Sequence, residues 1–239
     1  MIKLSIVIPA YNEEDRIIPA LEESIKYLEK QDYDSEILVV SDGSTDNTIK
    51  VAESFAQKTR VKIKALEYHP NKGKGYAVAY GMTRATGERV LFMDADYAVP
   101  INEVEKPMAL IDKGFDIAIA SRKIDGSVVS QHQNLLRELS AKLYTFLQNT
   151  YLGFSYPDTQ CGFKMFTAKA TKNLFSRQKL NSVIFDAEIL WLAKNMHYKT
   201  AQFPVKWSHI EDSRIQYDSI GKSLFIFKEL FSIKKLHKK

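Results

Sequence analysis

Two aspartates one residue apart, Asp94 and Asp96, directly follow the apolar run Leu91 to Met93. In a strand such residues point to the same side, and where the strand ends both can turn toward one ligand. Two carboxylates this close repel each other, and Mg²⁺ or Mn²⁺ removes the repulsion while keeping coordination positions open for phosphate oxygens. The pair therefore predicts a metal site. The alternative is a polar loop in which one aspartate caps the next helix.

The apolar run before these aspartates is one of five that alternate with helical patterns. Strands are expected at 2–10, 36–40, 61–68, 88–93 and 115–120, and helices at 13–30, 47–58, about 75–85 and 102–113. Strands linked by such long crossovers predict a parallel sheet covered by helices on both faces. Ligands bind at the carboxyl ends of the strands in these sheets. Polar clusters follow four of the strands, at 11–13, 41–44, 94–96 and 121–122, which predicts a nucleotide-binding edge.

The rhythm changes after residue 122. A loop is expected at 123–130, helices at 131–151 and 183–196, a turn at 157–162, and strands at 163–166 and 200–207. No internal repeat, low-complexity tract or linker divides the sequence, so the second half is expected to pack on the first. The predicted domain covers 1–215, with halves at 1–122 and 123–215, and a tail follows at 216–239.

Two polar loops carry candidate donor-binding residues. Asp42 precedes Gly43, in a loop that can approach a ligand closely, and its carboxylate could accept a hydrogen bond from a base; an Asx turn is the alternative. The loop from Lys72 to Gly75 has the composition of a phosphate-binding loop. It lacks the Gly-x-x-x-x-Gly-Lys-Ser/Thr frame, so a P-loop is not predicted.

Two arginines and two acids follow in the chain. Arg122 lies just past a predicted strand end and Arg137 further on, and arginine suits bidentate contact with phosphate; surface ion pairing is the alternative. Asp186 and Glu188 sit in an otherwise apolar helical segment. Periodicity does not settle which face of that helix they occupy.

Composition excludes several classes of protein. The 239 residues carry a net charge of +5, a single cysteine, Cys161, and five scattered histidines. An internal disulfide framework and a cysteine-rich or catalytic zinc site are therefore not expected. No run of about 18 apolar residues predicts a membrane span, and no signal peptide is recognised. The protein is expected in the cytoplasm.

The last eighteen residues, 222–239, hold six lysines and one acid, Glu229. The pattern predicts a basic amphipathic helix that binds a membrane surface, and packing back on the domain is the alternative. Nucleic acid is not an expected partner, because no recognised binding motif accompanies the charge. The expected apolar side comprises Leu224, Phe227, Leu230, Phe231 and Leu236.

These motifs together resemble a known family. The runs IVIPAYNEE at 6–14, SDGSTD at 41–46, NKGKG at 71–75 and DAD at 94–96 resemble the family 2 inverting glycosyltransferases of GT-A fold. The later runs DTQCGFK at 158–164, FDAE at 185–188 and PVKW at 204–207 resemble the dolichyl-phosphate β-glucosyltransferases and prokaryotic polyprenyl-phosphate transferases. The similarity covers nearly the whole chain. It implies an α/β fold of GT-A type, with a mostly parallel sheet flanked by helices and a C-terminal amphipathic extension.

The resemblance also implies roles for individual residues. Donor binding falls to Pro9, Tyr11, Glu13, Asp42, Lys72, Asp94 and Ala95. Metal binding falls to Asp94 and Asp96. Arg122 and Arg137 would lie near the reacting phosphates, and Asp186 would be an acceptor-site or structural acid. Two residues depart from the family pattern: Ser41 replaces a usual aspartate, and Tyr97 replaces a usual glycine, which bears on the shape of the sugar pocket.

The implied reaction is inverting, metal-dependent transfer of one sugar from a nucleotide sugar to a dolichyl or polyprenyl phosphate, on the cytoplasmic face of a membrane. UDP-glucose is the favoured donor, with GDP-mannose and UDP-N-acetylglucosamine as alternatives. The Gln-x-x-Arg-Trp signature of processive synthases is absent. A soluble transferase acting on a saccharide hydroxyl and a non-catalytic nucleotide-sugar-binding protein remain the competing interpretations.

Overall fold

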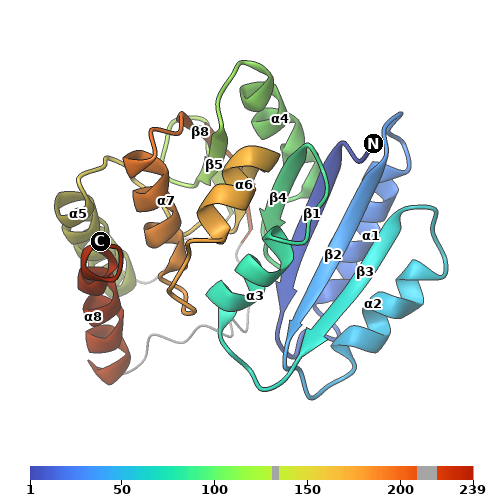
Figure 1. The fold of residues 1–239 in the computed structure, drawn as a ribbon, viewed down its shortest axis with the longest axis horizontal. Helices are drawn as coiled ribbons and strands as arrows, with labels where there is room; N and C mark the ends of the chain where they lie inside the picture. The colour runs from blue at the N-terminus through green and yellow to red at the C-terminus, as the bar shows by residue number, and fades with distance from the viewer. Residues whose placement is uncertain (131–134, 209–219, 239) are drawn as a thin grey trace.

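A seven-stranded sheet forms the centre of the molecule (Figure 1). The structure, a computed structural model, describes the backbone of residues 1–130, 135–208 and 220–238, and the side chains of 1–130, 141–208 and 224–238. The strand order is β3-β2-β1-β4-β7-β5-β8. The strands are β1 (Leu4–Ala10), β2 (Ser35–Asp42), β3 (Lys62–Tyr68), β4 (Arg89–Met93), β5 (Ile117–Ser121), β7 (Phe163–Thr167) and β8 (Thr200–Pro204). Two short strands, β6 (Val128–Val129) and β9 (Lys206–Trp207), pair separately.

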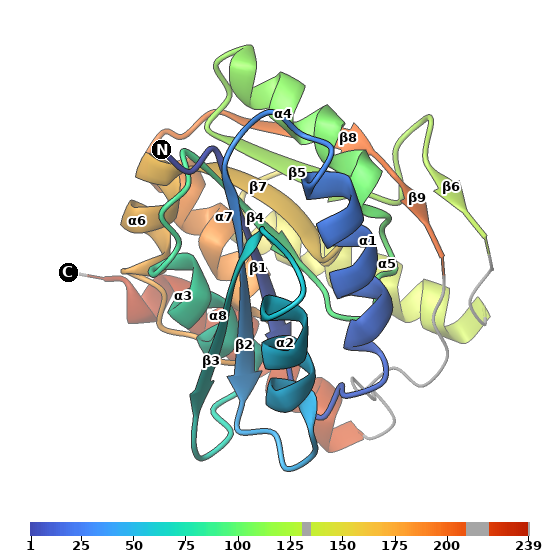
Figure 2. The ribbon, with the colours of Figure 1, turned by 90° about the vertical axis from the view of Figure 1, so that its right-hand side faces the viewer.

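Helices cover both faces of the sheet (Figure 2). One face carries α1 (Ile17–Leu28), α2 (Thr48–Ala56), the 3₁₀ turn η1 (Ile101–Val104) and α4 (Glu105–Asp112). The other carries α3 (Lys74–Met82), α6 (Ala168–Phe175) and α7 (Phe185–Asn195). Beyond α7 lie α5 (Leu135–Leu152) and α8 (Ile220–Leu236), which pack against each other. The α/β architecture expected from the sequence is confirmed.

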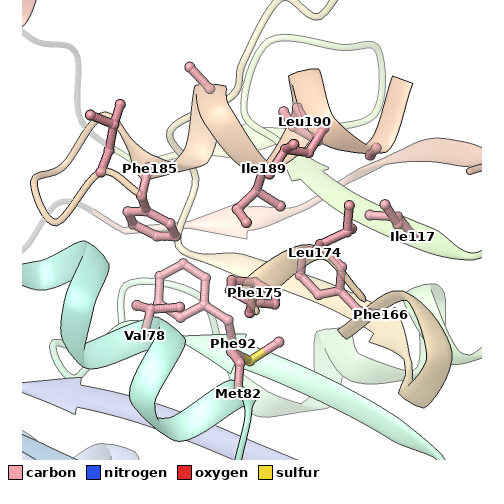
Figure 3. Close-up of a cluster of buried hydrophobic side chains, with 14 of the residues drawn as sticks. Val78, Met82, Phe92, Ile117, Phe166, Leu174, Phe175, Phe185, Ile189 and Leu190 are labelled. Carbon is pink, nitrogen blue, oxygen red and sulfur yellow. The ribbon is translucent and has the colours of Figure 1, made fainter. Parts of the chain in front are cut away.

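Two hydrophobic clusters hold these layers together. Strand β1 is buried along its whole length, as expected of a central parallel strand with helices on both sides. Val7 faces the cluster under α3, α6 and α7, whereas Ile6 and Ile8 face the cluster under α1 and α2. In the first cluster the rings of Phe92 and Phe185 meet edge to face with centroids 5.7 Å apart (Figure 3). This packing ties α7 to β4, the strand that leads to Asp94.

The second half departs from the expected pattern. Strand β7 runs antiparallel between β4 and β5, so the sheet is mixed. The expected strand 200–207 divides at Val205 into β8 and β9, which belong to different sheets. Helix α6 was not expected, because only a few apolar residues mark its eight-residue span; Thr167 caps it by accepting a hydrogen bond from the amide of Ala170. Local periodicity reports the type of element and carries no information on strand direction.

The C-terminal helix divides the apolar set expected on one side. Leu230 and Ile233 are fully buried against the domain, whereas Leu224 and Phe231 are 65% and 47% exposed. The prediction that these residues share one apolar side of the helix was therefore wrong. At about 3.6 residues per turn, their positions in the sequence place them at different angles around the helix axis. The boundary expected at residue 216 lies outside the described residues. Across the described part of the chain, none of the helices is long and apolar enough to span a membrane.

Candidate active site

The loops after β1 and β2 are bound together by hydrogen bonds between side chains and backbone. The Asn12 amide donates to Ser44 Oγ at 3.1 Å, and the Thr45 amide donates to Asn12 Oδ1 at 2.8 Å. The amide of Glu13 donates to Thr48 Oγ1 at 2.9 Å. Asn12 has a φ of 54°, in the left-handed region that asparagine tolerates. The two loops therefore form one edge at the carboxyl ends of the strands, as the sequence predicted.

Four of the seven residues expected to bind the donor differ in how far they are exposed. Pro9 is buried in β1, paired in register with Val40. Tyr11 is 42% exposed at the edge of the sheet. Glu13 lies 3.3 Å from Arg16 across an ion pair. Ala95 is buried, so it can offer a ligand little beyond its backbone.

Asp42 organises the loop that follows β3. Its Oδ1 accepts hydrogen bonds from the Tyr68 hydroxyl at 2.8 Å and the Lys72 amide at 2.7 Å. Its Oδ2 accepts from the Gly73 amide at 2.9 Å. Burial together with the Asp42 bond raises the pKa of Tyr68. The carboxylate expected to be free for a base thus already accepts three hydrogen bonds from the protein, and its role in base recognition stays a prediction.

The lysine-glycine loop at 72–75 does not form a free phosphate cradle. Lys72 Nζ lies over the ring of Tyr76, 4.5 Å from its centroid. The Gly75 amide donates to the carbonyl of Asn181 at 2.7 Å, so it is occupied by the protein. A Cβ at Gly73 would lie 2.5 Å from the same carbonyl oxygen, which explains the glycine. Close contact with the 180–182 segment therefore accounts for the glycines of this loop.

Among the described residues, Asp94 forms an ion pair with Lys74 and Asp96 forms one with Arg16. Lys74 Nζ is 2.7 Å from Asp94 Oδ1, and an Arg16 guanidinium nitrogen is 3.6 Å from Asp96 Oδ2. The two carboxylate side chains are 27% and 29% exposed. Burial and repulsion from Asp94 raise the pKa of Asp96. Burial alone would lower the pKa of Lys74, but the carboxylates around it raise that pKa.

This pair of aspartates fits a divalent metal shared with a phosphate ligand. Within the described residues no cluster of three or more histidine, cysteine or acidic side chains is arranged to hold a metal. Mg²⁺ is commonly held by one or two carboxylates, with phosphate oxygens and water completing its shell. Burial and, after it, repulsion from Asp94 raise the pKa of Asp96, and a bound cation would relieve the repulsion. Gly162 lies so close to Asp94 that a Cβ on it would sit 1.9 Å from Asp94 Oδ2.

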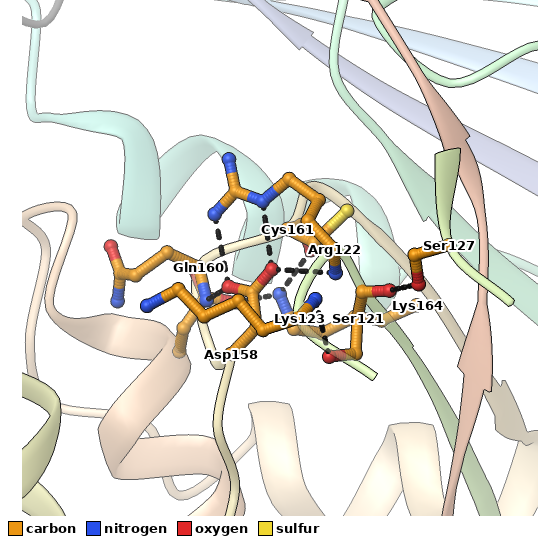
Figure 4. A network of polar contacts seen from close by, with 9 residues as sticks. Ser121, Arg122, Lys123, Ser127, Asp158, Gln160, Cys161 and Lys164 are labelled. Atoms are coloured by element: carbon orange, nitrogen blue, oxygen red, sulfur yellow. Dashed lines mark hydrogen bonds and ion pairs between the residues drawn. The ribbon is translucent and has the colours of Figure 1, made fainter. Parts of the chain in front are cut away.

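Arg122, whose side chain is 24% exposed, contacts the buried carboxylate of Asp158 through a fork of two guanidinium nitrogens (Figure 4). Its Nε and Nη2 donate to the two carboxylate oxygens at 2.7 and 2.9 Å, and its backbone amide donates to Oδ2 at 3.0 Å. Burial would raise the pKa of Asp158, but Arg122 outweighs it and lowers that pKa to about 2. The outer nitrogen, Nη1, points away from this fork (Figure 4). The sequence interpretation named Arg122 but not the acid that fixes it.

A second buried ion pair lies behind Lys74. Lys164 Nζ is 2.6 Å from Asp186 Oδ1 and donates to the Cys161 carbonyl at 2.6 Å, and both side chains are almost fully buried. Burial raises the pKa of Asp186, although Lys164 and Lys74 act in the opposite direction. Sequence reasoning missed both lysines. A charged residue between Phe163 and Met165 in a buried strand was the available signal for Lys164.

Three further residues that the sequence singled out are Arg137, Glu188 and Tyr97. Arg137 belongs to α5, but its side chain lies outside the described residues, so its role stays a prediction. Glu188 is fully buried. Tyr97 has a φ of 56°, which explains why glycine would suit the position. Its hydroxyl oxygen accepts a hydrogen bond from the Ile101 amide at 3.2 Å and its ring packs against the cluster under α1 and α2, while its effect on the sugar pocket stays a prediction.

The fold and this site define a class of enzyme. A family model described as Glycosyl transferase family 2 matches residues 5–175. The structure is similar to glucosyl-3-phosphoglycerate synthase from Mycobacterium tuberculosis, solved with Mn²⁺, UDP-glucose and phosphoglyceric acid, with a TM-score of 0.71 at 19% identity, covering 99% of this chain and 81% of that one. Mannosyl-3-phosphoglycerate synthase from Rubrobacter xylanophilus gives 0.71 at 18% identity, covering 99% and 74%. The fold is of the GT-A type.

Sequence comparison narrows this class. The dolichyl-phosphate beta-glucosyltransferase of Drosophila melanogaster is 33% identical over 94% of this chain and 74% of its own length. The human enzyme of that name is 34% identical, over 89% of this chain and 69% of its own. A Trichomonas vaginalis enzyme of that name is 35% identical, over 90% and 67%. The chain belongs to glycosyl transferase family 2, as its motifs indicated, and it is a glycosyltransferase related to the dolichyl-phosphate β-glucosyltransferases.

Proposed function

We propose that the protein transfers one sugar, with inversion, from a nucleotide sugar to a dolichyl or polyprenyl phosphate, with UDP-glucose as the favoured donor and Mg²⁺ or Mn²⁺ as the metal. The names of its relatives support the acceptor and the sugar. The observation that carries the proposal is the open pair Asp94 and Asp96 at the end of β4, faced by Lys74 and Arg16. Two carboxylates and two cations at one edge suit a metal bound to a diphosphate.

The reaction displaces a nucleoside diphosphate from the anomeric carbon of the sugar. Asp94 and Asp96 would hold the metal, which neutralises charge growing on the leaving diphosphate. Lys74 places a further positive charge beside Asp94, 2.7 Å from its carboxylate. Arg122, held by Asp158, would present its outer nitrogen to a phosphate. A phosphate oxygen of the acceptor would attack the anomeric carbon in line with the departing nucleoside diphosphate. This single displacement converts an α linkage to a β linkage.

The proposed lipid phosphate acceptor does not need a strong general base to become a nucleophile. A phosphate monoester has a second pKa of about 6, so near neutral pH it is largely a dianion and already nucleophilic. Asp186 is buried and 2.6 Å from Lys164, a position that suits a structural acid better than a proton acceptor. We therefore assign the first half, 1–122, to the donor and 123–215 to the acceptor. A saccharide hydroxyl would need a stronger base at this site.

We further propose that α5 and α8 hold the enzyme against the cytoplasmic face of a membrane. The inner side of α8 packs on the domain, and its outer side exposes Leu224, Phe225 and Phe231. Leu143 and Phe146 of α5 are 55% and 66% exposed. Exposed lysines on α8 accompany this apolar surface, an arrangement that favours an anionic lipid headgroup layer.

A transfer assay tests the acceptor, the donor and the metal together. Purified protein is incubated with Mn²⁺ or Mg²⁺, one of UDP-glucose, GDP-mannose or UDP-N-acetylglucosamine, and either a polyprenyl phosphate or a saccharide. We expect a β-linked glycosyl lipid phosphate from UDP-glucose, and its loss on chelation with EDTA. Product only with the saccharide would support the soluble transferase instead. The absence of transfer and donor hydrolysis under all conditions would support a binding protein.

Liposome co-sedimentation tests the membrane surface separately. Phe225→Glu places a charge on the exposed side of α8 and should lower the fraction bound to anionic vesicles severalfold. Val128→Glu is the matched control, because Val128 is 58% exposed on β6 and belongs to neither helix. Equal losses in the two variants, or none in either, would contradict the assignment of α8 to the membrane.

A further inference from the structure

Glu188 is a fully buried carboxylate that the proposed reaction does not use. It lies on α7, and its two oxygens accept hydrogen bonds from consecutive backbone amides. The Lys179 amide donates to Oε1 and the Leu180 amide to Oε2, each at 2.8 Å. His237, just beyond α8, places Nε2 2.5 Å from the same Oε1. One carboxylate therefore joins the C-terminal segment to the loop at 179–182.

The 179–182 loop in turn sets where α3 begins. The Asn181 carbonyl accepts from the amides of Gly75 and Tyr76 at 2.7 and 3.3 Å, which are donors in the first turn of α3. A Cβ at Gly75 would lie 2.7 Å from the Leu180 carbonyl oxygen. The two backbones thus lie so close that movement of the loop displaces the start of the helix.

Lys74 is the first residue of that helix. Its position decides whether Nζ can reach Asp94, which it now does at 2.7 Å. Lys74 Nζ also lies 5.5 Å from the centroid of the Phe92 ring, so the side chain is held between this ring and Asp94, and its reach depends on where the helix begins. The chain of contacts therefore runs from the C-terminal segment through Glu188 and the loop to the proposed metal site.

The C-terminal helix makes two further polar contacts with the same loop. The Ser182 hydroxyl donates to Glu229, and Lys179 Nζ donates to the Leu236 carbonyl at 2.5 Å. Together with His237, these contacts join α8 and the residue after it to both ends of the 179–182 segment. Leu230 and Ile233 pack in the hydrophobic cluster and by themselves would hold α8 on the domain. The polar contacts add a direct connection between α8 and the 179–182 loop.

We propose that Glu188 and His237 are positioning residues for the donor site, which act by holding the 179–182 loop so that Lys74 reaches Asp94. The C-terminal helix then serves donor binding as well as membrane attachment. The inference rests on the proposed function for the identity of the ligand, a nucleoside diphosphate with a divalent cation. It concerns neither the acceptor nor the sugar.

The test measures the Kd of UDP with Mn²⁺ on the full chain by calorimetry, at one temperature that lies at least about ten degrees below the lowest Tm among the variants. His237→Ala should raise the Kd five- to tenfold, because Lys74 is no longer held on Asp94. His237→Gln, whose amide can still donate to Glu188, should restore the Kd to within about twofold. Lys235→Ala, at an exposed position on the same helix, is the matched control and should leave the Kd unchanged.

A double-mutant cycle separates positioning from general loosening. In a Lys74→Met background, His237→Ala should cause no further loss of UDP binding, because the group through which it acts is absent. Additive losses would overturn the proposal. So would an unchanged Kd for His237→Ala, or a loss that His237→Gln fails to restore.

The wild-type measurement distinguishes failure of the proposed function from failure of the positioning role of His237. Wild-type protein that binds no nucleotide diphosphate with Mn²⁺ or Mg²⁺ would overturn the proposed function and this inference together. Wild-type binding that His237→Ala leaves unchanged would overturn the positioning role alone. Wild-type binding without transfer to a lipid phosphate would contradict the proposed acceptor and leave the positioning test valid.

Discussion

Two groups of charges, one after β4 and one after β5, differ in how completely their side chains are paired within the protein. Asp158 receives three hydrogen bonds from Arg122 and is nearly fully buried. Asp94 and Asp96 pair with Lys74 and Arg16, remain about a quarter exposed, and repel each other enough to help raise the pKa of Asp96. A closed pair stabilises the fold around it. An open pair with unrelieved repulsion is where a bound cation and its phosphate add most.

Removing an open carboxylate should have the largest effect, and the effect should fall on activity. Asp94→Ala or Asp96→Ala should abolish metal-dependent transfer, a loss of at least about a hundredfold, since a metal ion supplies several kcal/mol of charge stabilisation. Circular dichroism should report a folded protein. Asp32→Ala, at an exposed position near the opposite end of the sheet, is the control. Near-wild-type turnover in either site variant would contradict the metal assignment.

Breaking the closed pair should reduce stability instead. Asp158→Ala leaves the Arg122 guanidinium without its buried partner, which we expect to cost about 3–5 kcal/mol in free energy of unfolding. Glu23→Ala is the control, because it breaks an ion pair with Lys26 that is exposed on both sides and should cost less than about 1 kcal/mol. Urea unfolding measures both. Similar values for the two variants would mean that the fork contributes no more than a surface pair.

A methyl group at residue 162 tests how closely the open pair is packed. Gly162→Ala would place a Cβ 1.9 Å from Asp94 Oδ2, so the carboxylate must rotate away, and we expect kcat to fall about tenfold. Gly114→Ala is the control, because that residue has a φ of +89° and no neighbouring atom within 4 Å. It should lose about 1 kcal/mol of stability from backbone strain and keep its activity. Equal activity in both variants would argue against the close packing.

The smallest expected effect is a difference in acid stability. The pKa of Asp158 is about 2 in the folded protein, below its ordinary value of 3.8, so its contribution to stability is complete above about pH 5 and is lost as pH falls toward 2. Relative to Asp158→Asn, the wild type should lose about 1 kcal/mol more between pH 5 and pH 3. Denaturant unfolding at the two pH values checks this. Parallel losses would show that Arg122 does not depress the pKa.

Much of the first half could be predicted because its elements have strong, regular apolar patterns. The ends of β1, β2 and β4 lie within two residues of the expected positions. The assignment of Lys72 to donor binding stays a prediction, and the lysine that pairs with Asp94, Lys74, was not singled out from the sequence. Which of the two faces the site depends on where α3 begins, and Asn181, more than a hundred residues away, sets that point.

The faces of Asp186 and Glu188 could not be predicted for a different reason. Helix α7 is buried nearly all round, so its apolar residues form no stripe against which an acid can be placed. Both acids turned out to be buried, one 2.6 Å from Lys164 and the other bound to the 179–182 loop. Both partners lie outside α7, so the sequence of the helix alone gives no sign of them.

The sequence by itself determined the class of the protein: alternating strands and helices, polar clusters at strand ends, and two aspartates after a buried strand. Those features are local, because periodicity and the type of side chain are properties of a few adjacent residues. Only the tertiary structure decided the antiparallel direction of β7 and the partner of each buried charge. Lys74 and Asp94 are twenty residues apart, and Glu188 and His237 are forty-nine apart. Such pairs meet only when the layers pack, which is why the sequence could predict a site at the two aspartates but not the contacts around them.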